Sequence, residues 1–281
     1  MQRSDGTELT DVSETALWTL WCRGSEAARP NPIIHDELAV RLLEHIDYPY
    51  EQRFGAPTQT FALRASAFDA AVRDFLGEHP NGTVVSLAEG FQTSYWRLGR
   101  PRTRWVSVDL PPVVRLREQL LPQEEHIVPV ATSALDFAWA DHVEPGSPVL
   151  ITAEGLLCYL EKPLALGLIR GCAQRFPAGR FLFDALPSWW TKKKYKTFGT
   201  KDQLIGGSLA KTKYVVPPMP FPASPIEISK YPETIPGVAA VRPVPIGAGR
   251  GLAGRQIQAF YQSKLVPSRF RGTIAELRFA Q

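Results

Sequence analysis

The sequence has few cysteines, no long apolar run and little excess charge, and each absence argues against a class of protein. Its 281 residues include three cysteines, an odd number with no Cys-x-x-Cys pair, which disfavours a disulfide framework or a metal site such as zinc. No stretch approaches the roughly 20 apolar residues of a membrane-spanning helix. The polar start MQRSDGTELTDVSE does not resemble a signal peptide. We therefore expect a cytoplasmic protein without a bound metal.

The rest of the composition is that of an ordinary globular protein. Lys and Arg together number 32 and Asp and Glu 28, so the net charge is only +4. That excess is too small to indicate nucleic-acid binding by itself. With 44% hydrophobic residues, a chain of this length can bury a sizeable core.

The first eighty residues predict an N-terminal helical cap. Asp11 and Glu14 have the spacing of a capping box before the first helix. Apolar residues then recur at intervals of three and four. The predicted cap spans residues 1–80, with helices over residues 14–28, Asp36–Ile46 and Thr60–Leu76.

From residue 81 onward, short apolar runs alternate with helical stretches. This alternation predicts an α/β core, residues 81–281, with a parallel sheet covered by helices on both faces. Strands buried on both faces are continuously apolar, as these runs are. The predicted strands are Thr83–Leu87, Trp105–Val108, Ile127–Val130, Val149–Ala153 and Phe181–Phe183, with helices at Pro112–Leu121 and Leu164–Phe176.

Two later segments break the alternation. Residues 189–224 are rich in Lys, Gly and Pro, which is typical of a lid, a binding loop or a disordered insertion. Residues 238–246 and 255–263 have strand-like patterns joined by GAGRGLAG, which predicts a terminal antiparallel hairpin. Because a strand pattern follows these glycines, we interpret them as a hairpin turn and not as a phosphate loop. Residues 273–281 fit a strand or a helix.

The turn after the first predicted strand contains a single glycine, Gly90. In a doubly wound sheet the ligand lies beyond the carboxyl ends of the strands, and glycine lets the backbone approach it. A lone glycine also fits an ordinary turn. Asp109 ends the second strand about 20 residues later, where an acidic residue commonly binds ribose hydroxyls. It is equally placed to cap the next helix, and the two roles are compatible.

Glu154 follows the fourth predicted strand and would lie at the same rim of the sheet. Burial beside a cationic ligand would give it a binding role. Pairing with a surface lysine, or capping the next helix, would give it a structural one. The sequence leaves both open.

Several segments together resemble the leucine carboxyl methyltransferase-like family, in particular its bacterial branch of the tetracenomycin polyketide O-methyltransferase type. They are LAEGFQTSYWRL (87–98), WVSVDLPPVVRLREQLLP (105–122), PVLITAEGLLCYL (148–160) and RFPAGRFLFDALP (175–187). The match runs in order from about Glu14 to Pro220. It implies a class I S-adenosylmethionine-dependent methyltransferase with a Rossmann-like, seven-stranded sheet that ends in an antiparallel hairpin.

The resemblance also implies roles for matching residues. Arg64 would hold the methionine carboxylate of S-adenosylmethionine, because a guanidinium can bind a carboxylate in two places. Gly90 would let the backbone approach the cofactor, and Asp109 would hold the ribose. Glu154 would lie near the sulfonium and amino groups. The other predicted cofactor contacts are Ala88, Glu89, Leu110 and Gly155, and, along the adenine, Ser133, Ala134, Leu135 and Asp136.

The loop departs from the family pattern LGxGLDTR. Ala88 replaces its first glycine, Gln92 its aspartate and Ser94 its arginine. Alanine fits such a turn only with a negative φ or at a cost in strain. Glu89 adds a charge that could face the ammonium or sulfonium group. These departures keep open a non-catalytic small-molecule-binding paralogue; the single glycine and the terminal hairpin argue against a dinucleotide-dependent reductase.

Methyl transfer from a sulfonium requires mainly alignment and exclusion of water. A carboxylate acceptor needs no base, whereas a hydroxyl benefits from one, and no histidine is well placed for that role. Tyr159 is the candidate catalytic residue because it could hydrogen-bond the acceptor, although a packed core tyrosine is an equal alternative. The predicted acceptor pocket is apolar and includes Trp18, Trp21, Trp189 and Trp190. Of these, Trp18 and Trp21 are more typical of a core.

Seven lysines crowd residues 192–213, opposed only by Asp202. We favour a solvated loop, rank a lid that attracts an acidic acceptor second, and place contact with single-stranded RNA last. The prediction as a whole is an O-methyltransferase that acts on a carboxylate or hydroxyl of a small, apolar or acidic metabolite. We expect a monomer or homodimer with no nucleic-acid partner.

Overall fold

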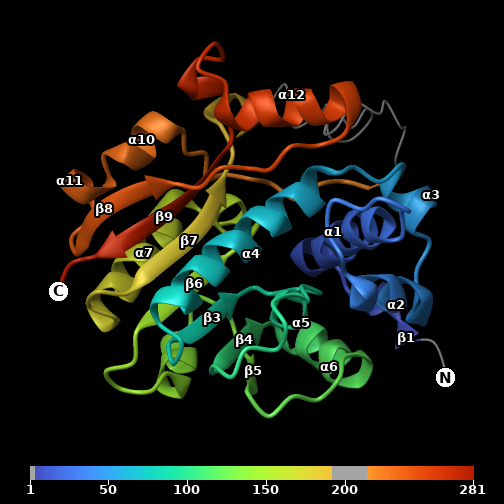
Figure 1. Ribbon diagram of the computed structural model, residues 1–281, viewed down its shortest axis with the longest axis horizontal. Helices are drawn as coiled ribbons and strands as arrows, with labels where there is room; N and C mark the ends of the chain where they lie inside the picture. The colour runs from blue at the N-terminus through green and yellow to red at the C-terminus, as the bar shows by residue number, and fades with distance from the viewer. Residues whose placement is uncertain (1–3, 192–213) are drawn as a thin grey trace.

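The computed structural model describes residues 4–191 and 214–281, and within them seven strands form one sheet (Figure 1). The strand order is β5-β4-β3-β6-β7-β9-β8. Strands β3 to β7 are parallel, whereas β9 is antiparallel to both of its neighbours. The predicted seven-stranded, mostly parallel sheet is thus confirmed. Its strands are β3 (Thr83–Leu87), β4 (Trp105–Asp109), β5 (Ile127–Ala131), β6 (Val149–Ala153), β7 (Arg180–Ala185), β8 (Val238–Pro243) and β9 (Thr273–Phe279).

Helices cover both faces of this sheet, as expected. On one face α4 (Thr60–Glu78) packs Phe68 and Phe75 against Val84 of β3. On the other, α7 (Lys162–Arg175) packs against Val85, the next residue along the same strand. Successive side chains of a strand point to opposite faces, so β3 contributes to both layers of the core. This double burial explains why the strands are continuously apolar.

The helices before α4 form a cluster beside the sheet that also packs on α4 and α6. They are α1 (Asp11–Ala27), α2 (Glu37–His45) and α3 (Tyr50–Phe54), and a short sheet of β1 (Ser4–Asp5) and β2 (Ile46–Asp47) joins them. The predicted capping box is wrong, because the N-cap of α1 is Thr10 and makes no side-chain bond. Glu14 instead binds Arg53 at 2.6 Å. The domain boundary at residue 80 stays a prediction, and α4 itself packs on the sheet.

The terminal hairpin was predicted with the wrong second strand. Residues 255–263 lie mostly in helix α12 (Gly251–Gln262), which is inserted between β8 and β9. Its buried residues Gly254 and Ile257 are three apart, as one face of a helix requires. The strand that pairs with β8 is β9, at the C-terminus. The glycine-rich stretch is therefore followed by a helix, contrary to our interpretation.

The predicted lid is described only at its ends, since residues 192–213 and their lysines lie outside the described residues. After the gap, Tyr214 is buried against Trp18 and Phe54, so the end of this segment belongs to the core. None of the helices in the described part is long and apolar enough to cross a membrane. The remaining elements are α5 (Ser94–Arg97), α6 (Pro111–Leu120), α10 (Pro225–Ser229), α11 (Tyr231–Thr234), η1 (Gly6–Glu8), η2 (Phe137–His142), η3 (Leu157–Tyr159), η4 (Ser188–Thr191) and η5 (Ser268–Phe270).

Candidate active site

A cavity of about 540 Å³ lies beyond the carboxyl ends of β3, β4, β6 and β7. Helices α1, α4 and α12 supply its other walls, and in Figure 1 the arrowhead of β7 points toward α12. This is where an α/β sheet of this kind binds its ligand. The strand ends bring the carboxylates, Glu89, Asp109, Glu154 and Asp184, whereas the helices bring Arg64, several uncharged polar side chains and large apolar ones such as Trp18, Phe61 and Phe260. The cavity therefore has a polar half and an apolar half.

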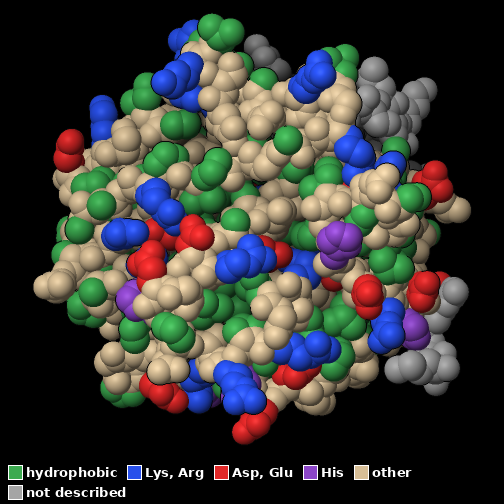
Figure 2. Space-filling model, viewed as in Figure 1, with side chains coloured by type: hydrophobic (Ala, Val, Ile, Leu, Met, Phe, Trp, Pro, Cys, Tyr) green, Lys and Arg blue, Asp and Glu red, His purple; other side chains and the backbone are tan. Residues whose placement is uncertain are grey.

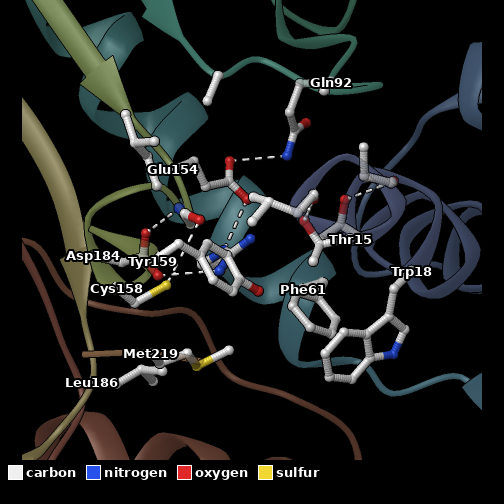
Figure 3. Close-up of a pocket in the computed structure, with 18 of the residues that line it drawn as sticks. Thr15, Trp18, Phe61, Gln92, Glu154, Cys158, Tyr159, Asp184, Leu186 and Met219 are labelled. Atoms are coloured by element: carbon white, nitrogen blue, oxygen red, sulfur yellow. Dashed lines mark hydrogen bonds and ion pairs between the residues drawn. The ribbon is translucent and has the colours of Figure 1, made fainter. Parts of the chain in front are cut away.

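Arg64 is at the centre of the polar half. Its Nε lies 2.9 Å from Glu154 Oε1, and its Nη1 lies 3.1 Å from Asp184 Oδ2. Figure 3 labels both acids at the cavity. Burial lowers the pKa of the Arg64 guanidinium, but Asp184 and Glu154 outweigh this effect and raise it above the ordinary value. Burial raises the pKa of Glu154, Asp184 adds to the rise, and Arg64 opposes it. The three side chains carry one net negative charge when all are ionised.

Gly155 gives the Arg64 guanidinium its space. It has φ +69°, and a Cβ there would lie 3.1 Å from Arg64 Nη2. Its amide donates to Asp184 Oδ1 at 2.5 Å. Gly155 thus holds the Asp184 carboxylate in place and leaves room for the Arg64 guanidinium. Asp184, at the end of β7, was not singled out from the sequence, although its place at a strand end was the available signal.

Asp109 holds the turn after β3. Its two carboxylate oxygens accept the amides of Gly90, at 2.6 Å, and Leu110, at 2.7 Å. Burial raises the pKa of Asp109 to about 6, and these two bonds oppose the rise. Asp109 does not cap α6, whose N-cap is Leu110. All three residues line the cavity.

The turn is strained at Ala88 and open at Gly90. Ala88 has φ +50°, so of the two alternatives for an alanine in this turn the structure has the strained one and not the negative φ. A left-handed residue of this kind costs roughly 1–2 kcal/mol. Gly90 has φ +56°, and a Cβ there would lie 3.2 Å from the Ala16 methyl group. Glycine suits Gly90 for both its backbone and its neighbour. Both residues line the cavity.

Glu89 does not offer a free charge to a ligand. Its carboxylate, although it borders the cavity, accepts from Trp105 Nε1 at 2.9 Å and from the Ser107 hydroxyl. Arg117 Nη2 lies 2.8 Å from the same carboxylate. Arg117 also donates to the carbonyl oxygen of Gly90 at 2.6 Å. The expectation that Glu89 faces an ammonium or sulfonium group is not supported, because Arg117 already compensates its charge.

The two other departures from the family pattern have new partners. Gln92 Nε2 donates to Glu154 Oε2 at 2.9 Å, and Ser94 donates to Asp69 at 2.8 Å. Arg97, one turn after Ser94, donates to Ser94 Oγ at 2.7 Å and also binds Asp69. A guanidinium is thus present beside position 94 even though the residue itself is serine. The sequence alone did not show that the Arg97 guanidinium lies next to position 94.

Three of the four residues predicted to contact the adenine line the cavity. Ser133, Ala134 and Leu135 line the cavity, whereas Asp136 does not. The Asp136 carboxylate accepts the Ala138 amide at 3.2 Å and caps η2. An aspartate just before a short helix often has this local role.

The residues predicted for the acceptor pocket are likewise only partly brought to the cavity. Trp18, Trp189 and Tyr159 line the cavity, and in Figure 3 Tyr159 points into it between Glu154 and Phe61. Trp21 does not line it, since its Nε1 donates to a backbone carbonyl at 2.9 Å and its ring stacks on a core tyrosine. The side chain of Trp190 lies outside the described residues. The sequence missed Phe61, Leu186, Met219, Ile257, Phe260 and Tyr261, which also line this half.

No histidine lines the cavity in the described part of the chain. Burial raises the pKa of Tyr159 well above its ordinary value, so its hydroxyl stays protonated at neutral pH. Burial likewise raises the pKa of the Cys158 thiol. These groups can donate hydrogen bonds but cannot act as general bases.

Comparison with known proteins agrees with this geometry. The family model for leucine carboxyl methyltransferase matches residues 16–173, more than half of the chain. The tetracenomycin polyketide synthesis O-methyltransferase TcmP of Streptomyces glaucescens is 34% identical over 185 residues, 64% of this chain and 68% of that protein. The S-adenosyl-L-methionine-dependent methyltransferase dpfgK of Gibberella zeae is 30% identical over 200 residues, 63% of this chain and 67% of that protein.

The fold is also found among solved structures. A candidate methyltransferase from Thermobifida fusca superposes with a TM-score of 0.54 at 15% identity, over 96% of this chain and 95% of that one. Identity this low speaks for the fold alone. The family is shown by the sequence matches, that is, the family model and the relatives at 30% identity or more. The chain therefore belongs to the leucine carboxyl methyltransferase family, and it is an S-adenosylmethionine-dependent methyltransferase.

Proposed function

We propose that the protein is an O-methyltransferase that methylates a carboxylate, in preference to a hydroxyl, of a small and largely apolar metabolite. The observation that carries this proposal is the divided cavity. Its polar half is negatively charged, and its apolar half has no base. The two halves suit a cationic methyl donor and an acceptor that is already a nucleophile.

The polar half fits the donor group by group. S-adenosylmethionine supplies a sulfonium methyl group together with an ammonium, a carboxylate, a ribose and an adenine. Arg64 would hold the carboxylate, and Glu154 and Asp184 would face the cationic groups. Asp109, at the carboxyl end of β4, would accept from the ribose hydroxyls. Ser133 and its two successors would lie along the adenine.

The apolar half supports a carboxylate acceptor. A carboxylate is ionised at neutral pH, whereas a hydroxyl benefits from a base. Arg64 already pairs with Glu154 and Asp184, the nearest acids, and Tyr159 stays protonated. Tyr159 would therefore donate a hydrogen bond to an acceptor oxygen. Phe61 and Trp18 would exclude water, which favours an in-line displacement.

A non-catalytic binding protein is the second candidate, and the strained Ala88 is the observation that favours it. The bonds of Gln92 and Arg97 argue against it. They give the altered loop defined contacts with Glu154 and Asp69.

Calorimetry with S-adenosylmethionine and with its demethylated product tests the donor site. We expect one site per chain, and Asp109→Ala should weaken binding about 100-fold or more, as expected for a lost bidentate charge-assisted contact. Asp136→Ala is the matched control, because Asp136 lies outside the cavity, and it should bind the donor normally. Absence of binding at millimolar donor would refute the proposal.

The acceptor class is tested by the chemistry of the product. Incubation of a metabolite extract with methyl-labelled donor should give a product that releases labelled methanol in mild alkali, as methyl esters do and methyl ethers do not. Tyr159→Phe should lower the rate about 10-fold, the equivalent of one hydrogen bond. An alkali-stable label would mean a hydroxyl acceptor, and no label at all would favour the binding protein.

A further inference from the structure

Helix α12 and the loop after it form a cationic surface, which we call the α12 surface and define as residues 250–271. It contains five Lys or Arg residues and no Asp or Glu: Arg250, Arg255, Lys264, Arg269 and Arg271. Figure 2 shows the same edge of the molecule, at the top, with blue and green side chains and no red among them. The chain as a whole carries only four net positive charges, so this excess is local.

Most of these charges have no acidic partner. Arg250 pairs with Glu26. Arg255, Lys264 and Arg269 are exposed, and none of them forms an ion pair with another residue of the described chain. Their charge is therefore available to a partner outside the protein.

Apolar side chains protrude between the cations. Leu265 is 94% exposed, Leu252 is 72% exposed, and Phe270 is 39% exposed. Leu265 in particular buries almost nothing within the protein. Leu and Phe side chains combined with Lys and Arg on one helical surface are the composition of helices that lie in a membrane interface.

The same helix faces the cavity on its other side. Ile257, Phe260 and Tyr261 line the apolar half. The loop after α12 contacts the cavity wall as well, because Trp189 Nε1 donates to the Phe270 carbonyl at 3.2 Å. The α12 surface and the acceptor site therefore share one helix.

We propose that the α12 surface docks the protein on anionic lipid membranes. Its cations would pair with lipid phosphates, and its protruding leucines would enter the acyl boundary. A bilayer accepts isolated side chains such as Leu265 without a complementary pocket, whereas an acidic protein would need one. Docking would place the acceptor cavity beside lipid-dissolved metabolites; this last consequence rests on the proposed function, whereas the docking itself does not.

Co-sedimentation of the full chain with vesicles tests the proposal. We expect binding to vesicles that contain phosphatidylglycerol, much weaker binding to pure phosphatidylcholine, and loss of binding in molar salt. The variant R255S/K264S/R269S should lose about fivefold in partitioning for each cation removed. The variant L252S/L265S should bind less well at each salt concentration at which the unchanged protein still binds, because it removes the apolar contribution.

A matched control uses an exposed cation and an exposed leucine on α7, which packs on the sheet away from α12. K162S/L164S should bind vesicles like the unchanged protein. Donor affinity, measured by calorimetry, should be the same in all variants, because none of the substituted residues lines the cavity. The proposal is overturned if the α12 variants bind vesicles as well as the control does. Retention on an acidic polypeptide without vesicle binding would overturn it too and indicate a protein partner.

Discussion

The two halves of the cavity are built in different ways. In the polar half each charged side chain has a specific partner, as Arg64 has Glu154 and Asp184 and as Asp109 has two backbone amides. In the apolar half the walls are rings and aliphatic chains from α1, α4, α12 and residue 219. The family match covers residues 16–173 and stops before β7 and α12. The difference teaches that the half proposed for the donor is set by charge, whereas the half proposed for the acceptor is set by shape.

The comparison predicts that the polar half tolerates change least. Arg64→Met would leave Glu154 and Asp184 buried together without a cation, and we expect the free energy of unfolding to fall by about 3–5 kcal/mol. Donor binding should be lost as well. Urea denaturation and calorimetry measure the two effects.

Arg104→Met is the control for this change, because Arg104 and Glu144 form a more exposed pair at 3.8 Å. A surface pair of this kind contributes roughly 1 kcal/mol or less. If the two variants lose the same free energy of unfolding, burial does not make the Arg64 cluster more important for stability than a surface ion pair.

The polar half should also depend on pH through Asp109. Its pKa in the folded protein is about 6, above the ordinary value of 3.8, because burial disfavours the charge. The stability that protonated Asp109 contributes, roughly 3 kcal/mol, is complete below about pH 4 and is lost as the pH rises through 6. Donor affinity should rise over the same interval, since the ionised carboxylate accepts the ribose hydroxyls. Asp109→Asn should remove this part of both pH dependences in denaturation and binding measurements.

A smaller effect should separate strain from function in the loop. Ala88→Gly should stabilise the protein by about 1 kcal/mol, since glycine adopts φ +50° without the steric cost. Ala178→Gly, at φ +60° and away from the cavity, should stabilise it similarly. Only the change at Ala88 should alter donor affinity. If both do, the loop conformation is not what links Ala88 to the donor.

The apolar half should give the smallest change in stability. Phe260→Leu keeps an apolar side chain of similar reach on a half-buried position and should cost less than about 1.5 kcal/mol. It should raise the KM for the acceptor several-fold and leave donor affinity unchanged. Steady-state kinetics and calorimetry together check this, and a matching loss of donor affinity would contradict the division of the cavity into halves.

Sequence patterns predicted the elements that have a strong local signature. The five parallel strands lie within two residues of their predicted ends, because continuous apolar runs mark a doubly covered sheet. Gly90, Asp109 and Glu154 were identified because they stand at strand ends. Helix α12 was taken for a strand, since the eight residues 255–262 fit both a period of two and a helical period.

The sequence by itself determined where the strands end and which residues stand at the rim of the sheet, since both follow from periodicity along the chain. Only the tertiary structure decided the partners. Arg64 meets Glu154 and Asp184 across separations of 90 and 120 residues. Likewise, packing alone brings Phe260 of α12 and Trp18 of α1 to the lining of one cavity. The physical reason is that secondary structure is governed by neighbours in the chain, whereas charge pairing and cavity shape depend on contacts made only when distant segments pack together.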